Sequence, residues 1–111
     1  MGLRWRSSAR GAVERRAALL AELRRVVFEA PARTEPAIRT AAATGGTLAE
    51  PLRSYATKVR DESYRVTDAD VAELKAAGVS EDEIFEVTVA AALGAACRRV
   101  DAGLRALGEE A

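Results

Sequence analysis

Histidine is absent from this 111-residue chain, and cysteine occurs once. Without histidine the chain lacks the usual general base near neutral pH and the commonest metal-binding imidazole. Nucleophile pairs of the Ser/His and Cys/His kind are excluded for the same reason. A single cysteine also cannot form an internal disulfide. These absences exclude most hydrolase mechanisms, and we expect neither a metal nor any other cofactor.

Long hydrophobic runs are missing as well. The longest apolar stretch lies within residues 84–97, and it is shorter than the roughly 20 residues that span a bilayer. No hydrophobic segment follows the charges at the N-terminus, so a secretory signal is not expected. The length fits one domain that can build a core without disulfides. We therefore expect a cytoplasmic protein with no membrane partner.

Alanine and arginine are abundant instead. The chain has 25 alanines, and 15 of its 17 basic residues are arginine, a composition typical of a GC-rich bacterial genome. Its 17 acidic residues balance the charge, but unevenly. Residues 1–25 carry seven arginines and two glutamates (7 − 2 = +5), which leaves −5 on residues 26–111. The opposed charges favour contacts within the fold or between subunits, and nucleic acid is not an expected partner.

The chain divides into a short basic tail and one helical domain. We expect residues 1–10 to form a flexible tail that could dock a protein partner, and residues 11–111 to form a single domain. In residues 12–28 the apolar positions recur every three or four residues, which predicts a helix. They are Val13, Ala17, Leu20, Leu23 and Val27. Two more helices are predicted at 35–44 and 50–62, each with a proline suited to its first turn and the former closed by Gly45 and Gly46.

Local capping signals define the last two helices. Thr67 can cap the N–H of Asp70, and Gly78 suits the left-handed residue that ends the fourth helix. A capping box from Ser80 to Glu83 starts a helix that runs to Leu107. This helix is apolar on nearly every side between residues 84 and 97, so we expect it to be buried all round, partly in a homo-oligomer interface. With no strand pattern, the predicted fold is all-α with about five helices.

Part of the sequence resembles a known superfamily. The run Val71–Glu86 (VAELKAAGVSEDEIFE), the alanine-rich helix after it, and the run Arg98–Leu104 (RRVDAGL) carry the resemblance. They resemble the alkylhydroperoxidase D-like superfamily, which includes the carboxymuconolactone decarboxylases. The resemblance covers residues 50–107, about half of the chain, and it implies a trimer or a hexamer made of two trimers.

The chain departs from that superfamily at its redox centre. Family peroxidases carry a C-x-x-C-x-x-x-H motif whose thiols and histidine would fall at Ser63, Val66 and Asp70 in this chain. Because a serine and a valine cannot supply the thiolate pair, thiol peroxidase activity by the family mechanism is not expected. Cys97 lies in the middle of the apolar helix, where burial is expected to leave its thiol inert. Peroxide chemistry through Cys97 is therefore the last of three hypotheses.

Two other hypotheses remain for the function. The leading one is a non-peroxidase accessory or binding subunit, oligomeric, with a small-molecule pocket at the former redox centre or with a protein partner. The alternative is a decarboxylase or isomerase in which Asp70 works with Tyr64 or Tyr55 as general acid and base. Glu62 and Glu50 are expected near these residues. The structural alternative is that Asp70 serves only the N-terminus of its helix. Whether the chain is an enzyme stays open at this point.

Overall fold

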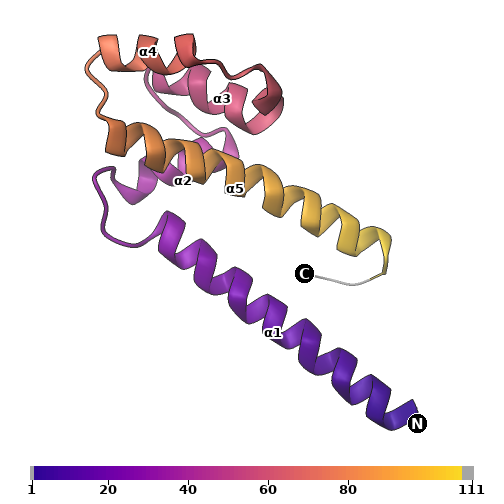
Figure 1. Cartoon of the computed structure of the whole chain (residues 1–111). Coiled ribbons are helices and arrows are strands. Elements are labelled where there is room, and N and C mark those ends of the chain that lie inside the picture. The colour runs from indigo at the N-terminus through magenta and orange to yellow at the C-terminus, as the bar shows by residue number, and fades with distance from the viewer. Residues whose placement is uncertain (1, 109–111) are drawn as a thin grey trace.

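The computed structural model describes the backbone of residues 2–108 and the side chains of residues 10–108 (Figure 1). These residues form five α-helices and one 3-10 turn and contain no strand, so the all-α prediction is confirmed. The helices are α1 (Gly2–Phe28), α2 (Pro36–Thr44), α3 (Leu52–Glu62), α4 (Asp68–Ala76) and α5 (Glu81–Ala106), and the turn η1 (Ser63–Arg65) follows α3.

The predicted caps are present at the helix ends. Thr67 and Ser80 each form a full capping box, in which their side chains accept from the N–H of Asp70 and of Glu83. Gly78 has a φ of +90°, and the N–H of Val79 closes the helix end on the carbonyl of Leu74 at 3.1 Å. The boundaries of α4 and α5 are therefore the ones that these local signals predict.

The core forms where α2 and α3 pack against the first half of α5, with α4 above α3 (Figure 1). Leu74 and Val87 are the largest fully buried side chains. The other members of the core cluster are mostly alanine, which lets the helices approach closely. They are Ala42, Tyr55, Ala56, Val59, Ile84, Ala90 and Ala91.

In the single chain α5 is covered on one side, and the expectation that it is buried all round also requires the predicted oligomer interface. The face that carries Ile84, Val87 and Ala91 is covered, but Phe85 is 68% exposed and Val100 is 46% exposed. The physical reason is geometric: α2 and α3 are short, so they cover one side of the first half of α5 and cannot reach around it. The expected oligomer interface on α5 stays a prediction.

Helix α1 begins at Gly2, ten residues before the predicted start, and projects away from the other helices (Figure 1). Residues 2–10, which were expected to form a tail, continue this helix, and the side chains of residues 1–9 lie outside the described part of the chain. Among the side chains of α1 that the structure describes, Val27 and Phe28 in its last turns pack on the core. None of the described helices is long and apolar enough to cross a membrane.

A buried arginine joins α1 to α2. Arg39 is 2% exposed and donates to the carbonyl of Val27 at 2.7 Å and to that of Ala30 at 2.6 Å. These carbonyls belong to the C-terminal end of α1 and the loop after it, where no helical N–H remains to satisfy them. The guanidinium therefore ties the end of α1 to α2.

A glutamate joins the same loop to α5. The carboxylate of Glu86 accepts three hydrogen bonds: from the N–H and hydroxyl of Thr34, both at 2.7 Å, and from the N–H of Arg33 at 3.0 Å. Burial alone would raise the pKa of Glu86, but the Thr34 and Arg33 hydrogen bonds and the Arg39 charge together lower it below the usual value. Glu86 is therefore held as a carboxylate that anchors the loop before α2.

Candidate functional site

A pocket of about 340 Å³ opens between α3 and α4. This volume is within the range of small-molecule sites, which start near 300 Å³. Helix α3 and the residues before it supply one wall, and α4 supplies the other. The lining residues are Glu50, Pro51, Ser54, Tyr55, Lys58, Asp70, Glu73 and Leu74. Asp70 and Tyr55, two of the three residues predicted for the site, share this pocket.

Asp70 is held from both sides by hydrogen bonds. Its Oδ2 accepts from the N–H of Thr67 at 2.8 Å, as part of the capping box of α4. Lys58 Nζ donates to Oδ1 at 3.0 Å and to Oδ2 at 3.1 Å. The Thr67 N–H first, and then the Lys58 ammonium, hold the pKa of Asp70 below its usual value. Asp70 is therefore an ion-paired carboxylate that also serves the N-terminus of its helix.

The hydroxyl of Tyr55 is used inside the fold. It lies 2.7 Å from Thr88 Oγ1, and the Thr88 hydroxyl in turn donates to the carbonyl of Ile84 at 2.6 Å. Because the single hydroxyl hydrogen of Thr88 goes to Ile84, Tyr55 must be the donor in the first bond. The ring of Tyr55 thus forms a wall of the pocket, while its hydroxyl proton is donated to Thr88 on α5.

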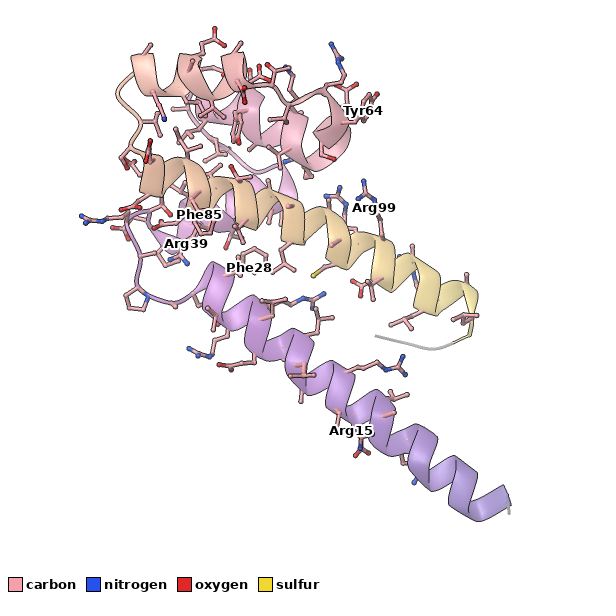
Figure 2. All side chains as sticks on the ribbon, viewed as in Figure 1. Arg15, Phe28, Arg39, Tyr64, Phe85 and Arg99 are labelled. Atoms are coloured by element: carbon pink, nitrogen blue, oxygen red, sulfur yellow. The ribbon has the colours of Figure 1, made fainter. Side chains whose placement is uncertain are left out.

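Tyr64 and Glu62, also expected near Asp70, do not line this pocket. Tyr64 is 84% exposed, and Figure 2 shows its side chain pointing outward from the turn after α3. Glu62 pairs with Arg65 at 3.0 Å on the surface. Both residues follow the pocket-facing part of α3, where the chain leaves the helix through η1. The structure therefore brings Asp70 together with Tyr55 and Glu50, and not with Tyr64.

The pocket has an excess of negative charge. Its ionisable lining consists of three carboxylates and one ammonium, which gives −3 + 1 = −2. Glu50 accepts from the Ser54 hydroxyl at 2.8 Å and from Arg53 at 2.9 Å, and these bonds, the Ser54 hydroxyl above all, lower its pKa. Glu73 makes no side-chain hydrogen bond or ion pair to any described residue. Glu73 is therefore the carboxylate of this pocket whose oxygens can all accept hydrogen bonds from a ligand.

The three positions to which the resemblance assigns the redox motif are scattered. Ser63 is exposed at the start of η1, Val66 packs against the core, and Asp70 alone reaches the pocket. Cys97 is on α5, 7% exposed, with its Sγ accepting from Arg24 Nε at 3.5 Å. The thiol is buried as expected, but its surroundings are not all apolar, because α1 brings the Arg24 guanidinium to it.

Lys58 and Leu74 belong to the site, but sequence reasoning did not find them. Lys58 lies three residues after Tyr55, so both are on the same face of α3, a spacing that could have identified it. Leu74 lies four residues after Asp70, so these two residues share one face of α4. What the spacing could not show is that these two faces meet.

The site shows no arrangement for a metal. Among the residues that the structure describes, no group of three cysteine or acidic side chains could hold an ion. Comparisons of the chain with protein-family models, with curated proteins and with solved structures find no match.

Proposed function

We propose that this chain is a non-peroxidase binding subunit of a homo-oligomer, built on an alkylhydroperoxidase D-like scaffold that lacks the redox centre. Its ligand is a small molecule with a positively charged group, bound in the pocket between α3 and α4. The observation that carries this proposal is the charge of that pocket: three carboxylates against one lysine, with Glu73 unengaged among the described residues.

The hydrogen bonds that the lining side chains already make determine which ligand charge the pocket favours. Lys58 is already paired with Asp70 through both carboxylate oxygens, so it has little left to offer an organic acid. An ammonium group entering the pocket meets Glu73 as a free partner and Glu50 and Asp70 as further negative charges. The ring of Tyr55 and the side chain of Leu74 supply apolar surface for a hydrocarbon chain. The pocket therefore favours an amine over a carboxylate.

The same contacts favour binding over catalysis. A general base works best with a pKa near the working pH, whereas the pKa of Asp70 is shifted downward. Tyr55 donates its proton to Thr88 and has none to give to a substrate. Peroxidase chemistry lacks its thiols, because Ser63 and Val66 replace them and Cys97 is buried on α5. Because these groups are already bonded or are missing, we propose a binding protein and not an enzyme.

An NMR titration tests the ligand class directly. Putrescine and succinate are a matched pair, since both have four carbons and they carry opposite charges. We expect putrescine to shift the amide signals of residues 50–58 and 70–74 and succinate to leave them unchanged. Glu73→Gln should weaken the putrescine response, since it removes the free carboxylate. The control Glu81→Gln, whose carboxylate bonds Lys75 outside the pocket, should not.

Two outcomes would contradict the proposal. Shifts with succinate in place of putrescine would indicate an organic-acid site and would return the decarboxylase hypothesis to first place. No shift with either compound at millimolar concentration would show that the pocket does not bind small charged molecules of this size.

A further inference from the structure

The pocket between α3 and α4 changes in character from its mouth to its floor. Glu73 is exposed, so its carboxylate lies at the mouth. Lys58 and Asp70 are half-buried and lie deeper in the pocket. Tyr55 is 7% exposed and Leu74 is 1% exposed, so these two side chains form the floor. A ligand that enters the pocket therefore meets a carboxylate first and hydrocarbon last.

Two of the three lining carboxylates already have a cation of their own. Asp70 is paired with Lys58 through both of its oxygens. Glu50 is paired with Arg53 at 2.9 Å, and Arg53 lies just outside the pocket lining. Glu73 has no cation partner among the described residues. With Arg53 included, the charge of the site is −3 + 2 = −1, so one negative charge is left for a ligand.

We propose that the ligand is a primary monoamine with a short hydrocarbon tail. Its ammonium group pairs with Glu73 at the mouth, and its tail lies on Tyr55 and Leu74 at the floor. The volume of about 340 Å³ corresponds to roughly ten water-sized groups, so a short alkylamine fits. Each methylene that leaves water for the apolar floor should strengthen binding about fourfold. This inference rests on the proposed function, and it names the class of amine that the proposed function leaves open.

Lys58 disfavours a ligand with a second ammonium group. Its own ammonium is part of the pocket wall, so the inner end of a diamine would lie near a like charge. The carboxylates on that side, Asp70 and Glu50, are already paired. An ammonium group that loses its water without gaining a free partner is costly to bury. The pocket therefore selects monoamines through repulsion of diamines as well as through attraction.

An NMR titration of the full chain with pentylamine and with putrescine tests the inference. The two amines have the same chain length, and pentylamine has a methyl group where putrescine has its second ammonium group. We expect both to shift the amide signals of residues 70–74 and pentylamine to bind about tenfold more tightly. The methyl signals of Leu74 should shift with pentylamine, since the tail reaches the floor. Glu73→Gln should weaken the binding of both amines.

A lysine variant tests the selection against diamines. Lys58→Met removes the ammonium from the wall and leaves Asp70 as a second carboxylate without a cation. Putrescine should then gain about tenfold in affinity relative to pentylamine. Asp70 keeps its hydrogen bond from the N–H of Thr67, so α4 keeps its cap. The matched control Lys75→Met, whose ammonium bonds Glu81 outside the pocket, should leave the ratio of the two affinities unchanged.

Three results would overturn the inference and leave the proposed function standing. They are putrescine binding to the wild-type chain as tightly as pentylamine, Leu74 methyl signals that do not respond to pentylamine, and a ratio of affinities that Lys58→Met does not change. In each case the pocket still binds an amine, but not in the manner inferred. No shift with either amine would overturn the inference and the proposed function together. Circular dichroism should show that the variants keep their helices.

Discussion

Gly94 on α5 lies directly against Ala43 on α2. A methyl carbon built at position 94 would stand 2.7 Å from the Cα of Ala43 and 2.8 Å from its Cβ, distances at which real carbon atoms do not pack. The contact is between backbones, so neither helix can move a flexible side chain out of the way. The absence of a side chain at Gly94 therefore sets how closely α2 and α5 approach.

Substitution of Gly94 by alanine should lower the free energy of unfolding. Alanine is favoured over glycine within a helix by about 1 kcal/mol, but overpacking of a filled core costs about 1–3 kcal/mol and wins here. Gly103, in the same helix, is the matched control, since nothing lies within 4 Å of its added methyl carbon. Urea denaturation should show Gly94→Ala destabilised and Gly103→Ala stabilised. Equal gains for both would contradict the close contact.

Loss of the Arg39 side chain should also destabilise the fold. Arg39→Met keeps the bulk of the buried stem, but leaves the carbonyls of Val27 and Ala30 without donors. We expect a loss of about 2–4 kcal/mol in the free energy of unfolding, measured by urea denaturation. The free energy of unfolding of Arg39→Lys should lie between those of the wild-type chain and Arg39→Met. The lysine ammonium does not reproduce the planar guanidinium fork that reaches both carbonyls. Arg16→Met, at an exposed position on α1, should change little.

The pH dependence of stability should follow Glu86. Its pKa in the folded state lies below the usual value of 4.5, which the unfolded chain is expected to show. The stabilisation that ionised Glu86 gives the fold is therefore complete above about pH 4.5. It is lost as the pH falls through the lowered pKa of the folded state. Thermal unfolding of Glu86→Gln should show a lower melting temperature at neutral pH and a smaller further loss in acid. Glu35→Gln, at an exposed position, should behave like the wild-type chain.

Cys97 should resist oxidation while the chain is folded. Its side chain, on α5, is buried, and Arg24 of α1 donates to its sulfur. Mass spectrometry after peroxide treatment should find the thiol unmodified in buffer and oxidised in urea. Arg24→Ala opens the α1 side and should make the folded protein react faster. Rapid oxidation of the wild-type chain in buffer would revive the peroxide hypothesis for this residue.

Helix ends were predictable because their signals are local. Thr67, Ser80 and Gly78 act on backbone groups within a few residues along the chain, so their capping bonds are the same in any helical fold. The close packing at Gly94 was predictable in part. A glycine in an apolar helix indicates close packing, but the sequence does not show which helix lies against it.

The pocket and the exposure of α1 depended on tertiary structure. Asp70 and Lys58 are twelve residues apart on different helices, and only the packing of α4 beside α3 makes them an ion pair. The apolar stripe of α1 predicted a buried face, yet α1 is longer than the body that it packs against, so Val13 remains exposed. Leu23 lies beside the body but is 46% exposed, whereas its neighbour Arg24 contacts α5. Sequence alone thus determined the helices and their ends, because the hydrogen bonds responsible are local. Which helix faces meet was decided only by the fold, because that depends on contacts between residues far apart along the chain.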